Sequence, residues 1–498
     1  KIKDIMKNKI DNKNSLERRK FIKTSVAGLW GVSLLSHLPA LASENTILYS
    51  PNLGDKMFFE EARDTPVIKE TDVIVCGGGP AGFAAAIAAA RTGASVTMLE
   101  VHGCLGGVWT AGLLSWLFEF DKPGITQELT KELDRRGARR GTNKGTYVYE
   151  VEEMKLLLEE KCVEEGVNFQ LFTRVVAAYK DENNKLTTVI TESKSGRQAW
   201  KANTFIDATG DGDLGALAGC GWDYGYKDTG ITQPMTFMSL ITVKNASRLG
   251  KFISFYDQGT KTGGHRVAMK AFKEELHRAG IEPSYGHPTL FRLRDNLIAL
   301  MINHEYGFCS FDSAQMTEAT VKGRAEVNKV VRALRNMGGD WKGVQLVASC
   351  EQIGTREGRR IHGKYTVTDS DLIMGISHED AIAHVTFGID IHAATAKENS
   401  ENALTNTTPE GLKAKPYDIP LRALIAKDVN GLLMAGRCIS GDFIAHASYR
   451  VTGTAVSMGQ AAGVLAGISS KDNRLPHEVK WKEVNEALKI SYTVAESK

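Results

Sequence analysis

The sequence predicts an α/β fold, in which helices pack against a mainly parallel β-sheet. Two short, apolar and β-branched runs, Asp72–Cys76 and Ser95–Leu99, have the composition of strands that are buried on both faces. The alanine-rich stretch between them, Pro80–Arg91, has the composition of a helix, and Gly93 can end it. Strand, helix and strand in this order form a βαβ unit, the connection that parallel strands require.

The turn between the first strand and the helix contains Gly77, Gly79 and Gly82 in the spacing G-x-G-x-x-G. In a βαβ unit the first glycine permits a tight turn, the second lets a pyrophosphate approach the backbone, and the third lets the helix pack against the strand. The helix N-terminus also offers unpaired N–H groups to phosphate oxygens. Glu100, at the end of the second strand, can accept hydrogen bonds from an adenosine ribose. The unit therefore predicts a dinucleotide-binding site.

The segments that follow indicate which dinucleotide is bound. Val151–Glu165 is predicted as an amphipathic helix and Asn168–Thr173 as a strand. Turn-forming residues then separate three further runs, which predict a β-meander leading into "TFIDATGDGD" at Thr204–Asp213. The strands of the meander are expected at Arg174–Tyr179, Leu186–Glu192 and Arg197–Asn203.

Near the other end of the chain, "VNGLLMAGRCISGDF" at Val429–Phe443 predicts a strand followed by G-R and G-D, and a helix is expected to start near Thr452. A meander that ends in strand-"ATG", together with this element, resembles the flavoproteins of the succinate dehydrogenase and hydroxybenzoate hydroxylase type. The resemblance implies a Rossmann-like FAD-binding domain in which Asp442 binds the ribityl and pyrophosphate part of FAD. It also implies that the last helix points its N-terminus at the flavin pyrimidine edge, where its dipole favours negative charge.

More closely, the chain resembles a family of FAD-dependent oxidoreductases that bacteria often export. The resemblance extends from about Asp72 to Gly467 and rests also on "GCLGGVWTAG" (Gly103–Gly112), "TREGRRIHGKY" (Thr355–Tyr365) and "GIDIHA" (Gly388–Ala393). The residues expected to bind FAD, from the motifs and from this resemblance, are Gly77, Gly79, Pro80, Ala81, Gly82, Glu100, Gly106, Gly107, Thr110, Val175, Thr209, Gly210, Arg437, Gly441, Asp442, Gly453 and Thr454.

The sequence contains one dinucleotide fingerprint, and no second G-x-G-x-x-G lies between a strand and a helix. It also lacks C-x-x-C, which argues against a disulfide reductase, and C-x-x-C-H, which argues against covalent haem. We therefore expect electrons to enter from a small-molecule substrate and to leave to oxygen, a quinone or a redox protein. No metal site is expected, because the seven cysteines show no metal-type pairing.

Three residues are candidates for catalysis. Oxidation of an alcohol or amine needs a base within hydrogen-bond reach of the departing proton. His446 is the first choice because it lies between the Asp442 element and the last helix, and a structural histidine that holds this loop is the alternative. His392 in "GIDIHA" is a second candidate base. Arg450 can steady an anionic substrate or the flavin O2, or it can fix a loop through a salt bridge.

Two groups of side chains are candidates for substrate contact. "TREGRR" brings Arg356, Arg359 and Arg360 together, and an arginine fork suits carboxylate or phosphate, although ion pairs on a helix surface are the commoner role of such a run. An aromatic group can form the wall of a sugar site, but we expect it to form buried core instead. This group consists of Trp109, Trp116, Phe118 and Phe120.

Two insertions are expected to interrupt the FAD-binding domain and to form an α+β substrate-binding cap, because active sites often lie between domains. The first should contain helices at roughly His265–Ala279 and Ser313–Met337. The expected order is a twin-arginine signal peptide (1–42), a linker (43–70), the first part of the FAD-binding domain (71–233), a cap insertion (234–343), an FAD-domain segment (344–368), a second cap insertion (369–416), the last part of the FAD-binding domain (417–470) and a C-terminal tail helix (471–498).

The first 42 residues differ in character from the rest of the chain. Arg18 and Arg19 precede an apolar run, Val26–Leu38, that leads to "ALA" at residues 40–42. Because this run is shorter than the roughly 20 residues that span a bilayer, the segment resembles a twin-arginine signal peptide, with a basic amphipathic stretch on a membrane surface as the alternative. We expect cleavage after Ala42, a periplasmic product and no stable membrane insertion. That export route carries folded proteins, so FAD can be loaded first.

Charge supports treating this segment separately. Residues 1–42 hold nine lysines and arginines and three acidic residues, a net charge of +6, whereas the whole chain carries +3. The remainder therefore carries −3. Nothing in that remainder indicates a nucleic-acid partner.

The leading hypothesis is a dehydrogenase or oxidase that acts on the CH–OH group of a small polar substrate, with a sugar or sugar derivative as the expected class. A fumarate-reductase-like reductase of activated double bonds is the enzymatic alternative, and it would use Arg356, Arg359 and Arg450 to bind carboxylates. A non-catalytic FAD electron carrier is the alternative from another class. Replacement of His446 separates enzyme from carrier, since only an enzyme that relies on it would lose rate.

Overall fold

The computed structural model describes residues 58–143, 146–227, 229–254, 264–392, 394–395, 411 and 413–497. The chain divides into two units, Lys1–Met57 and Phe58–Lys498, and all described residues belong to the second. The expected signal peptide lies outside the described residues, as does much of the expected linker.

The centre of the structure is a seven-stranded sheet of order β6-β2-β1-β9-β8-β7, with β18 beside β9. Its core strands run parallel, which confirms the predicted α/β fold class. β1 begins at Val67, inside the expected linker, because its first residues already pair with β9. The parallel strands are β6 (Asn168–Gln170), β2 (Val96–Leu99), β1 (Val67–Cys76), β9 (Gly196–Asp207) and β18 (Leu432–Met434).

The long strand β9 joins the parallel strands to the predicted β-meander. Its N-terminal half pairs antiparallel with β8 (Leu186–Ser193), which pairs in turn with β7 (Arg174–Lys180). Its C-terminal end pairs in parallel with β18, while β1 follows it along the other side. The third run of the meander, Arg197–Asn203, and the start of "TFIDATGDGD" therefore form one strand, since no turn-forming residue interrupts the pairing between them.

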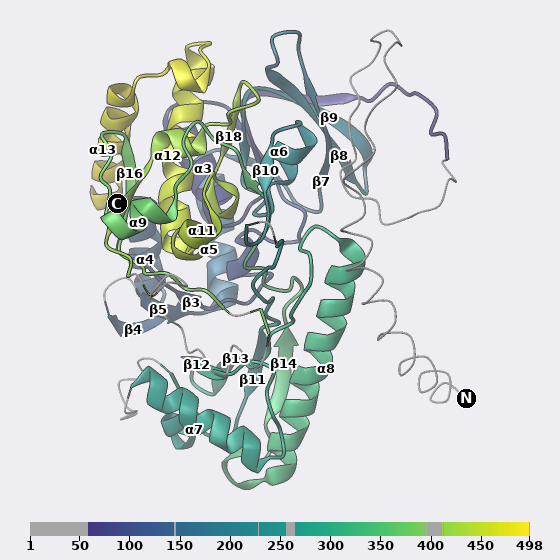
Figure 1. The fold of residues 1–498 in the computed structure, drawn as a ribbon, viewed down its shortest axis with the longest axis vertical. Helices are drawn as coiled ribbons and strands as arrows, with labels where there is room; N and C mark the ends of the chain where they lie inside the picture. The colour runs from purple at the N-terminus through teal and green to yellow at the C-terminus, as the bar shows by residue number, and fades with distance from the viewer. Residues whose placement is uncertain are drawn as a thin grey trace. The chain divides into compact units, whose positions relative to one another are not determined.

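Helices α3 (Pro80–Arg91) and α12 (Thr452–Lys471) pack against each other and lie side by side in Figure 1. Gly459 and Gly463, one turn apart on α12, permit this approach. A Cβ at these two positions would lie 2.0 and 2.2 Å from carbonyl oxygens of α3. The backbones of α3 and α12 are therefore in direct contact, and this contact holds α3, the helix that starts at the glycine turn, in place.

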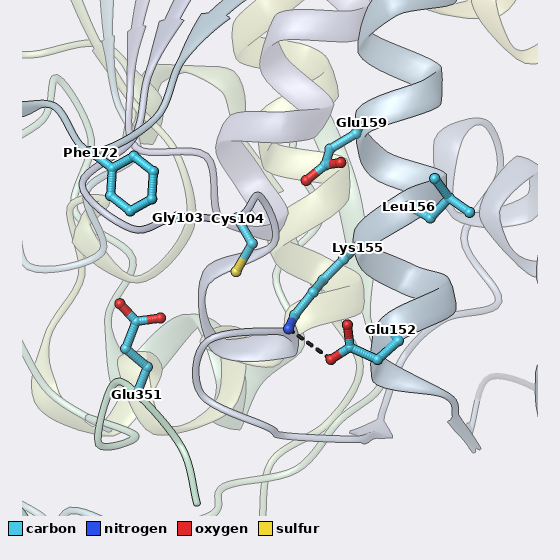
Figure 2. Close-up of a pocket in the computed structure, with 8 residues that line it drawn as sticks. All are labelled: Gly103, Cys104, Glu152, Lys155, Leu156, Glu159, Phe172 and Glu351. Atoms are coloured by element: carbon cyan, nitrogen blue, oxygen red, sulfur yellow. Dashed lines mark hydrogen bonds and ion pairs between the residues drawn. The ribbon is translucent and has the colours of Figure 1, made fainter. Parts of the chain in front are cut away.

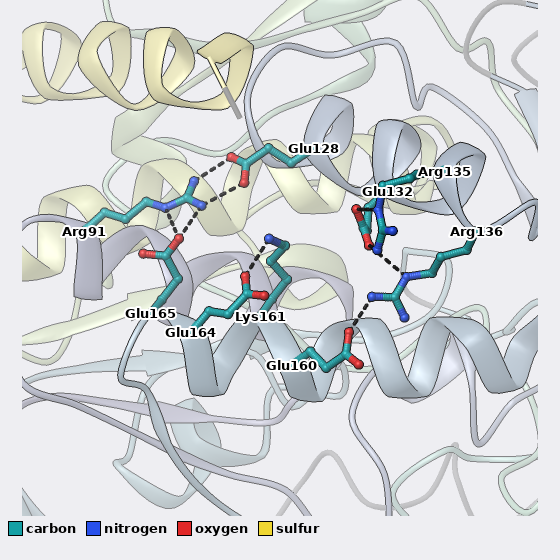
Figure 3. A network of polar contacts seen from close by, with 9 residues as sticks. All are labelled: Arg91, Glu128, Glu132, Arg135, Arg136, Glu160, Lys161, Glu164 and Glu165. Atoms are coloured by element: carbon teal, nitrogen blue, oxygen red, sulfur yellow. Dashed lines mark hydrogen bonds and ion pairs between the residues drawn. The ribbon is translucent and has the colours of Figure 1, made fainter.

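Arg91, the last residue of α3, holds three helices together (Figure 3). Its guanidinium donates to both carboxylate oxygens of Glu128 on α4 (Ile125–Arg135), at 2.6 and 2.7 Å. It also donates to Glu165 at 2.7 Å, directly after α5 (Val151–Glu164). None of the three side chains is more than 14% exposed, so this is a buried ion-pair network.

The first insertion folds as an α+β unit around a four-stranded antiparallel sheet of order β12-β13-β11-β14, with α7 and α8 beside it in Figure 1. α8 (Ser313–Met337) has the predicted bounds, and α7 (His265–Arg278) ends one residue before its predicted end. The boundary expected at residue 343 is corrected, because β14 follows it and pairs with β11. The strands are β11 (Ser239–Thr242), β12 (Thr289–Arg294), β13 (Leu297–Met301) and β14 (Gln345–Ser349).

The described part of the second insertion packs on the large sheet's helices. It contains α9 (Asp369–Met374) and β16 (Ala381–Val385), and β16 pairs antiparallel with β17 (Tyr417–Pro420). α9 contacts α11 (Phe443–Tyr449), and β16 contacts α12. Residues 396–410 of this insertion lie outside the described part of the chain.

A small sheet of order β3-β5-β4 contacts the first insertion. Trp116 of β3 stacks on Phe291 of β12, with ring centroids 5.3 Å apart. The aromatic group expected as core includes Trp109, Trp116 and Phe120, which are buried. The remaining helices and strands are β3 (Trp116–Leu117), β4 (Arg139–Asn143), β5 (Thr146–Tyr149), α6 (Asp213–Leu217), β10 (Trp222–Asp223), β15 (Arg360–Ile361) and α13 (Trp481–Ser497).

Within the described residues, no single helix is both long and apolar enough to cross a membrane. α11 and α12 meet that criterion only as a pair, which is bent by 94° at its junction. All seven cysteines are described, and none forms a disulfide. The same residues contain no group of three or more His, Cys, Asp or Glu side chains that could hold a metal ion.

Candidate active site

The glycine turn lies at the carboxyl end of β1, the edge at which open parallel sheets bind ligands. Gly77 has φ +100°, and a Cβ there would lie 2.4 Å from Ala208 O, so only glycine fits. A Cβ at Gly82 would lie 1.8 Å from Gly77 O. Gly79 differs, because no described atom lies within 4 Å of its Cβ position. α3 begins directly after it, at Pro80, so the helix N-terminus has open space in front of Gly79.

The loop that carries Gly106 and Gly107 packs over this turn. The Gly106 N–H donates to Gly78 O at 2.8 Å, and a Cβ at Gly107 would lie 3.1 Å from Gly79 Cα. Thr110 is buried, and its hydroxyl donates to a carbonyl of the same loop at 2.5 Å. A larger side chain at Gly107 would therefore press against the turn, whereas one at Gly106 would meet Thr110 and Leu158.

Glu100 ends up buried beside the same turn. Its carboxylate accepts the Gly78 N–H at 2.6 Å and the His102 N–H at 2.8 Å, so it fixes the turn and the following loop. The Thr173 N–H donates to the Glu100 carbonyl at 2.8 Å, which brings the start of β7 to this place. Val175, the residue predicted to bind FAD on β7, is half-buried two positions later.

The ends of β9 and β18 bring a second set of predicted residues to the same edge of the sheet. Arg437 Nη2 donates to Asp211 Oδ1 at 3.0 Å, whereas its Nη1 is buried without a hydrogen-bond partner among the described residues. Gly210 lies against this guanidinium, since a Cβ there would lie 2.7 Å from Nη2. Thr209 is held by Asp207, whose carboxylate accepts both its N–H and its hydroxyl.

Asp442 has a structural role that the sequence did not indicate. One carboxylate oxygen accepts the Ala445 N–H at 2.7 Å and caps α11, and the other accepts the Asp369 N–H at 2.7 Å. Gly441 lies against α11, because a Cβ there would lie 2.4 Å from a tyrosine hydroxyl. Contact between Asp442 and FAD stays a prediction.

The N-terminus of α12 carries the last two predicted residues. A Cβ at Gly453 would lie 2.1 Å from Glu119 O, so this position requires glycine. The Thr454 hydroxyl is buried, and no described residue forms a hydrogen bond with it. Like Arg437 Nη1, it is a buried polar atom of the kind that usually has a ligand or a water as its partner.

A polar cluster lies where the first insertion meets the segments around α11. It consists of Gln233, His304, Arg356, Asp390, His392 and Arg450, and is termed here the Arg356–Arg450 cluster. Gln233, His304 and His392 in it are buried, and its three charged side chains are half-buried. Gln233 Oε1 accepts the His392 N–H at 2.9 Å and lies 3.4 Å from Arg450 Nη2. Arg450 Nη2 also donates to Asp390 O at 2.7 Å. Arg356 Nη2 lies 3.2 Å from His304 Nε2, and the His304 and His392 rings are 4.9 Å apart.

His392 and Asp390 form a dyad within this cluster. His392 Nε2 lies 3.4 Å from Asp390 Oδ1, whereas Nδ1 has no hydrogen-bond partner in the described part of the chain. Burial and the Arg356 guanidinium lower the pKa of His392 to about 4, although Asp390 acts in the opposite direction. Burial alone would raise the pKa of Asp390, but His392 and the two guanidiniums bring it below its ordinary value. At neutral pH the dyad is therefore a neutral imidazole beside an ionised carboxylate.

His446 lies next to the cluster rather than in it. It is fully buried on α11, and neither ring nitrogen has a hydrogen-bond partner among the described residues. Its Nδ1 is 3.8 Å from Glu357 Oε1, and Glu357 accepts N–H groups of Gln233 at 3.3 and 3.4 Å. Burial and then Arg360 hold the pKa of His446 well below its ordinary value. His446, the first-choice base, therefore reaches the cluster only through Glu357, which contacts Gln233.

The fold divides the arginines of "TREGRR". Only Arg356 belongs to the cluster. Arg359 pairs with Asp213 at 2.9 Å, and Arg360 donates to two backbone carbonyls. The run forms a loop and β15 rather than a helix, so the interpretation as helix-surface ion pairs is wrong.

A separate cavity of about 490 Å³ lies beside Cys104 (Figure 2). None of its lining residues belongs to the Arg356–Arg450 cluster. Lys155 and Glu152 form an ion pair at 2.7 Å within it, and burial raises the pKa of the Cys104 thiol, which disfavours the reactive thiolate. The cavity is lined by Gly103, Cys104, Glu152, Lys155, Leu156, Glu159, Phe172 and Glu351.

The fold and the first of these sites define a flavoprotein that binds a dinucleotide at the carboxyl ends of parallel strands. FAD fits the residues present: the N-terminus of α3 at Gly79 can take the pyrophosphate, and the unpartnered Arg437 Nη1 and Thr454 hydroxyl can bind polar atoms of the cofactor. The model of the family described as FAD dependent oxidoreductase matches residues 72–488, and the chain belongs to this family. The protein is therefore an oxidoreductase with FAD as its cofactor.

Similarity to individual proteins is more limited. Over 68 residues the chain is 40% identical to mitochondrial dihydrolipoyl dehydrogenase of Pisum sativum, covering 14% of this chain and 12% of that protein. A geranylgeranyl bacteriochlorophyll reductase-like structure from Thermoplasma acidophilum has a TM-score of 0.44 at 14% identity, covering 86% of this chain and 87% of that chain. For p-nitrophenol 4-monooxygenase from Pseudomonas putida the TM-score is 0.41 at 11% identity, covering 86% and 88%. Both structural likenesses are distant.

Sequence reasoning missed half of the cluster. Gln233 and His304 belong to no motif that predicts chemistry, and Asp390 was not singled out within "GIDIHA". Folding brings the three residues together with the rest of the cluster. One signal was present, because "DIH" places an acid two residues before His392. That pair was the available sign of an oriented histidine.

Proposed function

We propose that this FAD-dependent oxidoreductase oxidises the CH–OH group of a small polar molecule at the Arg356–Arg450 cluster, with sugars and sugar derivatives as the first class to test. The observation that carries the proposal is the His392–Asp390 dyad, an unprotonated base beside a carboxylate among buried polar groups. FAD, when bound, accepts the hydride from the donor carbon.

His392 Nδ1 accepts the hydroxyl proton of the substrate in this proposal. It has no competing hydrogen-bond partner among the described residues, and with a pKa of about 4 the imidazole is unprotonated at neutral pH. Asp390 orients the ring from the Nε2 side and stabilises the imidazolium that forms. Arg450, held by Asp390 and Gln233, positions a polar group of the substrate. His446 is the alternative base.

The test is anaerobic reduction of the bound flavin. Purified FAD-loaded protein is mixed with pools of sugars, sugar alcohols and sugar acids, and the visible flavin absorbance is followed. Bleaching by one pool is the expected result, and division of that pool then identifies the substrate. A flavin that stays oxidised with every CH–OH donor would overturn the proposal.

The acceptor is proposed to be oxygen, a quinone or a redox protein rather than a nicotinamide nucleotide, because the sequence has one dinucleotide fingerprint. After anaerobic reduction, each acceptor is added in turn and the return of the flavin absorbance is timed. Reoxidation by one of the three is expected. Faster reoxidation by NAD⁺ or NADP⁺ would contradict this part of the proposal.

A second candidate function is the reduction of an activated double bond next to a carboxylate. Arg356 and Arg450 lie in one cluster, as this reading requires, although Arg359 does not join them. Chemically reduced protein is mixed anaerobically with fumarate and with acrylate. Rapid reoxidation, together with no bleaching by CH–OH donors, would replace the first function with this one.

We also propose export by the twin-arginine route, supported by Arg18, Arg19 and the apolar run that follows them. The precursor is expressed in a bacterium, and periplasmic protein is sequenced from its N-terminus. A start at Ser43, and cytoplasmic retention after lysine replacement of both arginines, are expected. An uncleaved chain that never reaches the periplasm would contradict export.

A further inference from the structure

We infer that the substrate is a hydroxy-carboxylate, whose carboxylate binds Arg356 while its hydroxyl lies at His392. The inference rests on the proposed function, in that it places the substrate at the same cluster. It adds the chemical class of that substrate and the residue that recognises it.

Arg356 is a cation without an anionic partner. Its Nη1 donates to Pro234 O at 2.6 Å and to Thr236 Oγ1 at 2.8 Å, and its Nη2 lies 3.2 Å from His304 Nε2. All three acceptors are neutral, and no carboxylate in the described part of the chain forms an ion pair with this guanidinium. Burial and Arg450 lower the pKa of Arg356 only to about 10, so it stays charged at neutral pH. A shielded charge of this kind favours a bound counterion.

The neighbouring charges leave this positive charge uncompensated. Arg450 is matched by Asp390, whose Oδ2 lies 3.1 Å from Nη2. Burial and the guanidinium of Arg356 hold the pKa of His304 well below its ordinary value, so His304 and His392 are neutral. The cluster therefore carries one net positive charge.

A carboxylate is the anion that matches one positive charge. It carries a single negative charge at neutral pH, and its two oxygens fit the planar donors of a guanidinium. A phosphate group carries about −1.5 to −2 at pH 7, which exceeds the charge available here. The class of ligand is therefore a carboxylic acid rather than a sugar phosphate.

The positions of Arg356 and His392 indicate a second functional group in the substrate, a hydroxyl. The His304 imidazole contacts both Arg356 and His392: its Nε2 lies 3.2 Å from Arg356 Nη2, and the ring centroids of the two histidines are 4.9 Å apart. His392 is 7% exposed, and its Nδ1 lacks a partner among the described residues. A molecule held by its carboxylate at Arg356 can thus place a nearby hydroxyl at His392, as 2-hydroxy acids and sugar acids do.

The test measures binding rather than turnover. FAD-loaded protein is titrated at constant ionic strength with glycolate, lactate, malate and gluconate, and with the uncharged amide of each acid. Perturbation of the flavin spectrum and the shift in melting temperature report binding. At least one acid should bind about 10-fold or more tightly than its amide, because the amide leaves the half-buried charge of Arg356 unpaired. Equal binding of every acid and its amide would overturn the inference.

Arg356→Gln removes the charge that is proposed to bind the carboxylate. Arg335→Gln is the control, because Arg335 also donates to a backbone carbonyl but lies outside the cluster. Arg356→Gln should abolish the preference for acid over amide, Arg356→Lys should retain part of it, and Arg335→Gln should keep it. If Arg356→Gln keeps the preference, the assignment fails. If this variant does not fold, the comparison of acid with amide in the unaltered protein decides alone.

The two proposals fail in different ways. If neutral sugars bleach the flavin and no acid is preferred over its amide, the oxidation of a CH–OH group stands and the carboxylate inference falls. If an acid binds selectively but none of the acids bleaches the flavin, the Arg356 site stands and the oxidation proposal falls.

Discussion

The glycine turn and the Arg356–Arg450 cluster lie in one protein but are built in opposite ways. The turn takes its residues from one short stretch, Gly77–Gly82, and closes around backbone contacts. The cluster collects side chains from five segments that are far apart in the sequence, between Gln233 and Arg450. A cofactor site of the first kind can be recognised as a motif, whereas a substrate site of the second kind exists only after folding.

The largest effect should come from the turn itself. In Gly82→Ala the new Cβ would lie 1.8 Å from Gly77 O, so α3 must move away from β1. We expect a loss of at least about 3 kcal/mol in unfolding free energy and loss of bound FAD. Denaturant unfolding and the flavin absorbance measure both.

Gly79→Ala is the matched control, because no described atom lies near its Cβ position. Protein without FAD should keep its stability within about 1 kcal/mol, while FAD affinity falls about 10-fold or more because the methyl group occupies space in front of the helix N-terminus. Equal effects of the two substitutions on apoprotein stability would contradict the geometry of the turn.

Arg91 tests the other end of α3, away from the glycine turn. Arg91→Ala leaves Glu128 and Glu165 buried without their shared cation, so we expect a loss of about 3–5 kcal/mol in unfolding free energy. Arg135→Ala, which removes an ion pair whose arginine is 71% exposed, should cost no more than about 1 kcal/mol. Thermal and denaturant unfolding check this, and a similar loss in both variants would show that burial of the Arg91 network does not matter.

Replacement of the two histidines distinguishes the bases. His392→Asn should slow anaerobic flavin reduction about 100-fold or more, because the group that takes the proton is lost, while FAD content stays unchanged. His446→Asn should change the rate less than about 10-fold, since His446 lies outside the cluster. The reverse order would restore His446 as the base.

The smallest expected effect is that of pH near neutrality. The base must be unprotonated, so kcat/KM should fall as pH drops through the pKa of His392, about 4, and stay flat above it. Between about pH 6 and pH 8 the rate should therefore vary little. A titration with its midpoint near the ordinary histidine value would contradict a buried, unprotonated His392.

The same contrast explains which features could be predicted from the sequence. The bounds of α3 and α8 were predictable because composition and caps act locally: Pro80 starts α3, and Asp312 accepts the Ala314 and Gln315 N–H groups at the start of α8. Dinucleotide binding followed from the glycine spacing in the same way, whereas FAD was indicated by the later segments and the family that they resemble.

Errors arose where distant pairing decides. β9 extends to Asp207, beyond the predicted end at Asn203, because β1 and β18 pair with its last residues. β14 lies beyond the expected cap boundary because β11 pairs with it. Asp442 caps α11 and binds the Asp369 N–H, a contact that no local pattern contains. Gln233 and His304 could not be predicted as site residues for the same reason.

The central claim is that Arg356 binds the substrate while His392 takes its proton. The most direct test is anaerobic flavin reduction by the hydroxy acid that binds most tightly, measured as a function of acid concentration in unaltered protein, Arg356→Gln and His392→Asn. The structure predicts that Arg356→Gln raises the dissociation constant about 10-fold or more with a similar limiting rate, because it removes a charge that binds substrate. His392→Asn should lower the limiting rate about 100-fold with a similar dissociation constant. If both variants change the same constant, or if neither constant changes, the cluster is not the substrate site.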